Sequence, residues 1–225
     1  MYAEEHLIAA ARRLFQLAMD NDECASNPAA KVDKPKRPKS SRHALTHDQV
    51  AELFNSCDRD EDTVTLRFFV ETGCRREGLI NLTRQDLRPN LQTVWLDEKN
   101  SARREQPISQ ALLIALMPED CHLYRMTRRQ IDGLWTRVRR AVPWAADLGV
   151  SSHWLRHYAV TNIEQVGGYA TAAAFAGHQL LGGSTSTYVH VGLPQMARAW
   201  SVLWNEPHPL AEEALTGSSV TPLAG

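Results

Sequence analysis

The feature that most constrains the fold of this 225-residue chain is a proline-rich basic stretch near its start. Residues 27–42, NPAAKVDKPKRPKSSR, carry three prolines and many charges, which predicts an extended linker. Residues 3–20 before it have the apolar spacing of one amphipathic helix. A single helix cannot bury its own apolar face. This helix must therefore pack on the following domain, on a partner or on sequence outside this chain.

After the linker, the chain has mainly helical periodicity and one short region of strand character. Helices are expected over residues 47–54, 63–73, 76–83, 110–116, 128–141, 153–166, 169–176 and 193–204. Segments 93–99 and 104–109 are predicted to form a small hairpin. The sequence therefore predicts a mainly α fold with a small antiparallel β-sheet (α+β).

These patterns divide the chain into four segments. A first helix occupies residues 1–30, and a basic interdomain linker follows over residues 31–44. The main domain covers residues 45–205. Residues 206–225 are rich in small and polar residues, and we expect a disordered tail there.

The composition is that of an ordinary soluble protein, with 43% hydrophobic and 23% charged residues. No apolar run approaches the length needed to cross a bilayer. The first ten residues contain acids where a signal peptide would carry positive charge. The four cysteines are scattered, without a CxxC pair, as is typical of reduced cytosolic proteins. A cytoplasmic protein without a membrane partner is predicted.

Positive charge is concentrated in two places, although the net charge is only −1. Residues 31–42 and residues 121–140 each contain six basic residues and one acidic residue. Such segregation can create a local positive surface for a polyanion. Each run alone can equally be a solvated linker or helix face, so bulk charge leaves both interpretations open.

Two short motifs carry candidate chemistry. In SSHWLRHYAV (151–160), His153, Arg156 and His157 have the spacing i, i+3 and i+4, which places them on one helix face. That face is either a solvated stripe or an anion site. In TGCRREGLINLTRQDL (72–87), Arg75 follows the glycine that ends a helix. A buried arginine needs an oxygen partner, which would be a phosphate or the carboxylate of Glu77 or Asp86.

Together these motifs resemble the tyrosine recombinase family, also called the phage integrase family, from about Ala44 to about Leu193. The resemblance rests on TGCR (72–75), on HWLRHYAVT (153–161), on GH followed by a tyrosine (177–188), and on a hairpin with a lysine in its turn and Pro107 at its end. Residues 1–30 resemble the last helix of the family's core-binding domain. The main domain, 45–205, then corresponds to the family's catalytic domain.

The sequence departs from the family pattern at two places. The family often has a glutamate three residues after its first arginine, but Gly78 holds that place here and Glu77 lies one residue earlier. The spacing from the GH pair to the tyrosine is one residue longer than the common form.

The resemblance implies a site-specific recombinase that cleaves and rejoins duplex DNA through a 3′-phosphotyrosyl intermediate, with no metal or other cofactor. Tyr188 would be the nucleophile and His153 its base, and Lys99 would protonate the leaving 5′-oxygen. Arg75, Arg156 and His178 would stabilise the charged transition state. These roles suit the residue types, because tyrosine needs a base at neutral pH and forked guanidiniums clamp phosphate oxygens. His157 is expected to bond a neighbouring backbone group or Asp86.

The resemblance also implies partners. Duplex DNA is the expected substrate, bound by four copies of the chain that are monomers in solution. The residues expected to meet DNA are Lys36, Arg37, Lys39, Arg42, Arg128, Arg129 and Arg137. A phage or mobile-element origin fits. The last helix, 193–204, has an apolar face that would dock on a neighbouring protomer or pack within its own chain.

Two other functions remain open from the sequence. Type IB topoisomerases relax supercoils with similar chemistry, although the compact size and the GH-to-tyrosine spacing favour a recombinase. A truncated remnant that binds DNA or a protein partner without cutting is compatible with the nearly neutral charge. The complete, ordered set of reactive side chains argues against this remnant.

Overall fold

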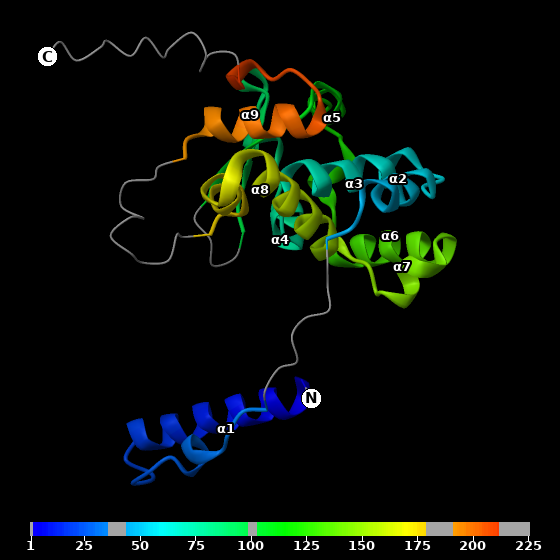
Figure 1. Ribbon diagram of the computed structural model, residues 1–225. Coiled ribbons are helices and arrows are strands. Elements are labelled where there is room, and N and C mark those ends of the chain that lie inside the picture. The colour runs from blue at the N-terminus through cyan, green and yellow to red at the C-terminus, as the bar shows by residue number, and fades with distance from the viewer. Residues whose placement is uncertain (1, 36–43, 99–102, 179–190, 212–225) are drawn as a thin grey trace, which may run out of the picture. The chain divides into compact units, whose positions relative to one another are not determined.

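The computed structural model describes residues 2–35, 44–98, 103–178 and 191–211, and divides the chain into two compact units, Met1–Arg42 and His43–Gly225 (Figure 1). The described helices agree with the predicted mainly α class. None of them combines the length and apolar character that crossing a bilayer requires. The described residues also bring no three metal-ligating His, Cys, Asp or Glu side chains together.

The first unit consists of helix α1 (Tyr2–Asp20) and a 3-10 turn, η1 (Pro28–Lys31). The Arg12 side chain joins them, because its Nε donates to the Ala29 carbonyl at 3.1 Å and its Nη2 donates to the Val32 carbonyl at 2.6 Å. The start of the predicted linker is therefore folded back on α1 rather than extended. The apolar side chains of Leu7 and Leu14 are exposed.

The second unit carries the remaining elements. Its α-helices are α2 (His47–Asn55), α3 (Asp60–Thr72), α4 (Arg76–Ile80), α5 (Gln110–Leu116), α6 (Arg128–Ala141), α7 (Pro143–Asp147), α8 (Ser152–Ala176) and α9 (Leu193–Trp204). Its 3-10 turns are η2 (Arg84–Asp86), η3 (Pro89–Leu91) and η4 (His122–Arg125). Its strands are β1 (Leu87–Arg88), β2 (Thr93–Leu96) and β3 (Arg104–Pro107).

Local sequence explains most helix starts. Thr46 and Thr127 form capping boxes with Gln49 and Gln130 at the starts of α2 and α6. Helix α3 begins at Asp60, three residues earlier than expected, and its acidic first turn suits the positive end of the helix dipole. The prediction missed this turn because consecutive acids carry no apolar periodicity. Helix α7 was not expected at all.

The strands form one antiparallel sheet in the order β1-β2-β3. The expected hairpin is confirmed as β2 and β3, with Leu96 opposite Arg104 and Thr93 opposite Pro107. Strand β1 was missed, because two residues are too few to show an alternating pattern.

Helix α8 is one continuous element that covers both of the helices expected over residues 153–166 and 169–176. The break lies at Gly168, whose backbone angles of φ 77° and ψ 171° are not helical, so the helix kinks there and continues to Ala176. Trp154 and Leu155 near its start are buried in the main core. Helices α9 and α6 lie on opposite sides of the layer that α3 and α8 form (Figure 1).

Helix α9 packs within its own chain. Its Met196, Ala199 and Trp200 form a second core cluster with Ile163 and Phe175 of α8. Of the two expectations for this helix, the structure therefore shows packing in cis.

The residues after α9 correct part of the expected disordered tail. His208 and Leu210 are buried, and a His208 ring nitrogen bonds the Gln92 carbonyl at 2.9 Å. The Glu206 side chain accepts from the backbone N–H of Gln110 at the start of α5. Residues 206–211 are thus attached to the domain, and residues 212–225 lie outside the described part of the chain.

Candidate active site

The site begins where α3 ends. Gly73 is the C-cap of α3, with φ 55° in the left-handed region. A side chain there is excluded also by space, because a Cβ would lie 2.6 Å from Cε1 of Phe175. Glycine thus lets the chain turn tightly against the end of α8. The turn delivers Arg75 to the N-cap position of α4.

Arg156 is buried and is held by main-chain oxygens. Its Nη1 donates to the Gly73 carbonyl at 2.6 Å, and its Nη2 donates to the Ala176 carbonyl at 2.5 Å. Both carbonyls lie at helix C-termini, where the helix dipole favours a cation. Burial, and then the charges of Arg104 and Arg75, lower the pKa of Arg156 to about 10. The guanidinium therefore stays protonated at neutral pH.

Glu98, just beyond the end of β2, joins the arginines. Its Oε2 accepts from Nη1 of Arg75 at 2.6 Å. Its Oε1 accepts from the backbone N–H of Arg75 at 2.5 Å and from Nη2 of Arg104 at 3.2 Å. Nη1 of Arg156 lies 4.0 Å from Oε2. Burial alone would raise the pKa of Glu98, but Arg104, the Arg75 N–H and Arg156 hold it below its usual value.

This pairing corrects the two carboxylates, Glu77 and Asp86, that were considered for Arg75 beside a phosphate. Glu77 instead accepts two hydrogen bonds from Arg128, and Asp86 pairs with Arg103. Sequence reasoning looked for a nearby acid, whereas the partner is 23 residues away.

Arg104 is a further residue that sequence reasoning missed. It is buried, and it donates to the carbonyls of Gly73 and Phe175 as well as to Glu98. Gly177 makes room for it, because a Cβ at Gly177 would lie 2.8 Å from Cδ of Arg104. Arg104 opens β3, and Gly177 lies more than 70 residues later in the sequence. No local pattern therefore predicts the contact between them.

Arg75, His153 and Arg156 line one cleft of about 390 Å³. Its other lining residues are Arg76, Ile131, Asp132, Trp135, Ser151 and Ser152. His153 lies in the first turn of α8, so the cleft gathers the end of the α3–α4 turn, α6 and α8. Asp132 pairs with Arg76, so the cleft also presents the guanidiniums of Arg75 and Arg156 and the imidazole of His153, which suit a phosphate group.

His157 differs from its expected role. Its Nε2 lies 3.1 Å from Nε2 of His153, and the two rings meet edge to face with centroids 4.6 Å apart. One imidazole therefore donates while the other accepts, which links the tautomers of the pair. The expected contact with Asp86 is wrong, because that carboxylate accepts from Thr83 and Arg103.

His178 follows Gly177 at the end of α8 and is exposed. Burial lowers its pKa, and the charges of Arg156, Arg75 and Arg104 lower it further. The imidazole is therefore neutral at pH 7 and has one N–H to donate. It does not line the cleft, but it lies within the electrostatic reach of all three guanidiniums.

The predicted Arg75, His153, Arg156 and His178 thus come together around the ends of α3 and α8. A profile of the Phage integrase family matches residues 43–193, about two thirds of the sequence. The chain belongs to the phage integrase family. Its match begins and ends within one residue of the expected resemblance.

Curated relatives of this integrase-family chain are tyrosine recombinases. XerC of Pseudomonas aeruginosa (strain LESB58) is 26% identical over 230 residues, which cover 92% of this chain and 73% of XerC. XerD of Pasteurella multocida (strain Pm70) is 30% identical over 109 residues, which cover 46% of this chain and 37% of XerD.

Solved structures share the fold. The integrase from mycobacterium phage Brujita superposes with a TM-score of 0.58 at 20% identity, covering 88% of this chain and 71% of the integrase. A lambda integrase tetramer bound to a Holliday junction gives a TM-score of 0.58 at 15% identity, covering 84% and 60%. These similarities confirm the expected tyrosine recombinase catalytic-domain fold.

Several residues predicted for this integrase-family site lie outside the described residues. They are Lys99 and Tyr188 of the catalytic set and Lys36, Arg37, Lys39 and Arg42 of the linker. Glu98 is the described residue directly before Lys99, and Val191 follows Tyr188 by three residues.

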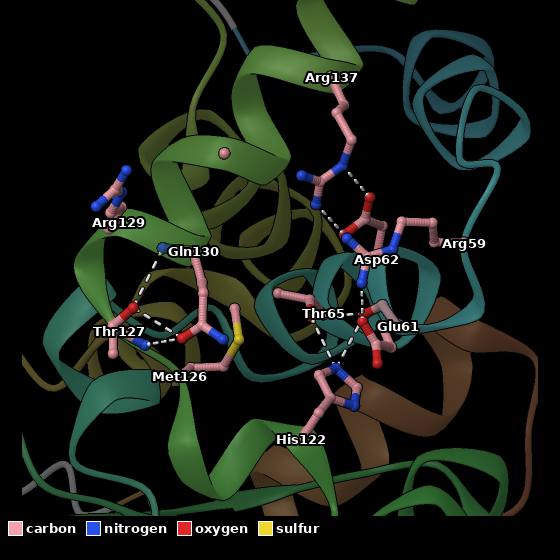
Figure 2. A pocket seen from close by; sticks show the side chains of 11 residues that line it. Arg59, Glu61, Asp62, Thr65, His122, Met126, Thr127, Arg129, Gln130 and Arg137 are labelled. Carbon is pink, nitrogen blue, oxygen red and sulfur yellow. Dashed lines mark hydrogen bonds and ion pairs between the residues drawn. The ribbon is translucent and has the colours of Figure 1, made fainter.

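The three predicted DNA contacts on α6 have different surroundings. Arg137 makes a bidentate pair with Asp62, with N–O distances of 2.7 and 2.6 Å. Arg128 pairs with Glu77. Within the described residues Arg129 makes no ion pair, and it lies across a pocket of about 370 Å³ from the Arg137–Asp62 pair (Figure 2). Arg129 therefore has the most available charge of the three.

Proposed function

We propose that this chain cleaves and rejoins duplex DNA by transesterification at a phosphodiester, as a site-specific recombinase. The observation that carries the proposal is the convergence of Arg75, Arg156 and His153 on one cleft. Forked guanidiniums match phosphate oxygens in shape and charge. A scissile phosphate in this cleft would meet permanent cations that the protein already holds in place.

The arginines would act on the transition state. Attack on phosphorus increases the negative charge on the non-bridging oxygens, and preformed donors stabilise that charge without reorganising. Arg156 is suited to this because two carbonyls and its burial leave it few alternative positions. His178, neutral at pH 7, would donate its N–H to the same oxygens.

The covalent step balances with the residues of the proposal. The Tyr188 oxygen attacks phosphorus and gives its proton to His153, while the bond from phosphorus to the 5′-oxygen breaks. Lys99 gives a proton to that oxygen, which leaves as a 5′-hydroxyl. Attack by a 5′-hydroxyl on the phosphotyrosyl bond then restores a phosphodiester and frees Tyr188.

The assembly belongs to the same proposal. The lambda integrase structures contain a dimer bound to a core site and a tetramer bound to a Holliday junction. By analogy, four copies of this chain would assemble on two duplex sites in the cytoplasm. Arg128, Arg129 and Arg137 of α6 and the basic residues at 36–42 would meet phosphates, which supply affinity rather than sequence preference.

The domain assignment is likewise proposed. Residues 1–30 would be the end of a core-binding domain, residues 31–44 the linker, and residues 45–205 the catalytic domain. The exposed Leu7, Leu14 and Leu17 of α1 support this, because an amphipathic helix with an open apolar face needs a partner.

A covalent-trap assay tests the function. Nicked duplexes that tile the DNA flanking the gene are incubated with the protein in EDTA and resolved on a denaturing gel. We expect an SDS-resistant adduct with the wild type, and none with Tyr188→Phe. The matched control is Tyr169→Phe, because Tyr169 is 70% exposed on α8 and has no role in the proposed step.

The outcomes separate the assignments. An adduct that survives Tyr188→Phe but is lost in Tyr169→Phe would move the nucleophile to Tyr169. DNA binding without any adduct would instead support a non-catalytic binding protein. Relaxation of supercoils without sequence dependence would indicate a topoisomerase.

A further inference from the structure

A side chain at position 78 would crowd Glu98 in this molecule. A Cβ at Gly78 would lie 3.0 Å from Oε1 of Glu98 and 3.1 Å from its Cγ. Gly78 is the third residue after Arg75, where the family often carries a glutamate. The distance of 3.0 Å is one that a glutamate spans between its own Cβ and its carboxylate oxygens. The Glu98 carboxylate therefore lies within the reach that a glutamate side chain at position 78 would have.

Glu98 reaches this place from a different element. Gly78 belongs to α4, whereas Glu98 follows β2 by two residues. Its carboxylate binds the backbone N–H and the guanidinium of Arg75 at the start of α4, and Arg104 at the start of β3. One side chain thus fastens both stems of the β2–β3 hairpin to the first catalytic arginine.

Among the described carboxylates, Glu98 is the one within ion-pair distance of Arg75, Arg104 and Arg156. The Glu98 side chain is 1% exposed and has three guanidiniums within 4.0 Å. Glu77, its neighbour in α4, pairs with Arg128, and Asp86 pairs with Arg103. A buried carboxylate among three guanidiniums offsets the repulsion between their positive charges. Removing the carboxylate leaves that repulsion uncompensated.

We propose that Glu98 is the positioning residue of the catalytic arginines, standing in from the hairpin for the carboxylate that Gly78 lacks. Its effect on catalysis rests on the proposed function. Because Glu98 directly precedes Lys99, the same contact sets the base of the hairpin that carries the proposed general acid. The position of Arg75 and the position of the base of that hairpin are then coupled through Glu98.

An exchange of the two residues tests the proposal. Four proteins are compared: wild type, Gly78→Glu, Glu98→Gly, and the double variant Gly78→Glu/Glu98→Gly. Each single change is expected to lower Tm, the first by overlap and like charge, the second by leaving the arginines without their carboxylate. The double variant is expected to regain most of the lost Tm, because its carboxylate returns to the same place.

The rate of adduct formation is the measurement that distinguishes a positioning role from a role in packing alone. At saturating nicked DNA, Glu98→Gly is expected to slow adduct formation by about 100-fold, the scale of one lost transition-state contact. The double variant is expected to recover to within about 10-fold of the wild type, with the remainder reflecting the altered hairpin. Glu105→Gly is the matched control, since Glu105 lies on β3 and bonds Thr93 rather than an arginine of the site.

Failure of this proposal and failure of the proposed function look different. If the wild type forms adducts but the double variant recovers neither Tm nor rate, the role of Glu98 is refuted and the function stands. Recovery of Tm without recovery of rate also refutes the positioning role. If the wild type forms no adduct on any duplex, the function fails, and the Tm comparison still decides where the carboxylate lies. Should Glu98→Gly not fold, a folded double variant is itself the expected rescue.

Discussion

The stability cost of replacing an arginine depends on whether its partners are backbone carbonyls or a carboxylate. Arg156 rests on the main chain at the ends of two helices. Arg137 is half-exposed, but it is fastened to the buried Asp62 through two hydrogen bonds. Removing Arg137 therefore leaves a buried carboxylate without its partner, which is costly in proteins.

We expect Arg137→Gln to lower the free energy of unfolding by about 1–3 kcal/mol, reduced from the fully buried case because Arg137 is 43% exposed. Arg129→Gln should change it by no more than about 0.5 kcal/mol. Urea unfolding measures both.

For DNA binding we expect the reverse order, with Arg129→Gln having the larger effect and Arg137→Gln the smaller one. The available charge of Arg129 makes it the better phosphate contact, so Arg129→Gln should flatten the salt dependence of the DNA dissociation constant by about one counterion. An unchanged stability in Arg137→Gln, or an unchanged salt slope in Arg129→Gln, would contradict the assignment.

At the residue scale, the sequence identified the catalytic candidates but not their partners. Arg156 and His153 were found because their spacing is local to one helix. Glu98 and Arg104 were missed because their contacts depend on how a hairpin meets the ends of α3 and α8. Of the two partners expected for His157, Asp86 was wrong, and the contact with His153 at i−4 on its own helix was missed.

At the scale of the element, α8 shows backbone geometry deciding where glycine is needed. Gly168 has φ 77° and ψ 171°, a region that essentially only glycine enters, yet a Cβ there would meet nothing within 4 Å. The sequence periodicity predicted a break at this point, which we interpreted as the end of one helix and the start of another. It is instead a kink that lets the second half of α8 pack on α9.

Gly168→Ala is expected to lower the free energy of unfolding by about 1–3 kcal/mol through backbone strain alone. Gly149→Ala is the control, because its Cβ also meets nothing, while its φ of 61° lies in the milder left-handed region. Denaturant unfolding should show the larger loss for Gly168→Ala. Equal losses would mean that the two conformations are equally strained.

At the scale of the whole molecule, one buried acid makes global stability depend on pH. Glu71 of α3 accepts from the N–H and the hydroxyl of Ser109, the N-cap of α5. Burial raises its pKa from 4.5 to about 7, against those hydrogen bonds. The folded protein thus keeps a proton that the unfolded chain releases above about pH 4.5. This contribution is complete below that pH and is lost as pH rises through 7.

Glu71→Gln should remove this dependence. Between pH 5 and pH 8 the wild type is expected to lose up to about 3 kcal/mol relative to the variant. Chemical unfolding at each pH measures the difference, which cancels the opposite effect of His208, whose pKa burial lowers. A constant difference across this range would show that Glu71 is ionised in the folded protein.

The overall class was predictable because amphipathic periodicity is a property of consecutive residues. The packing of residues 206–211 was not, because His208 meets Gln92 across 116 positions of the chain. Polar composition alone therefore made this segment look like a free tail.

The anchoring of Arg156 has a consequence for inheritance. Its hydrogen-bond acceptors are peptide oxygens, which every amino acid contributes alike, so a substitution at position 176 that preserves the backbone path leaves that acceptor in place. A site anchored in this way can keep its geometry while surrounding side chains drift. Divergence to 15–30% identity from the proteins compared is compatible with an unchanged guanidinium position. The Glu98 contact is the opposite case, since a side-chain anchor survives drift only if another side chain replaces it.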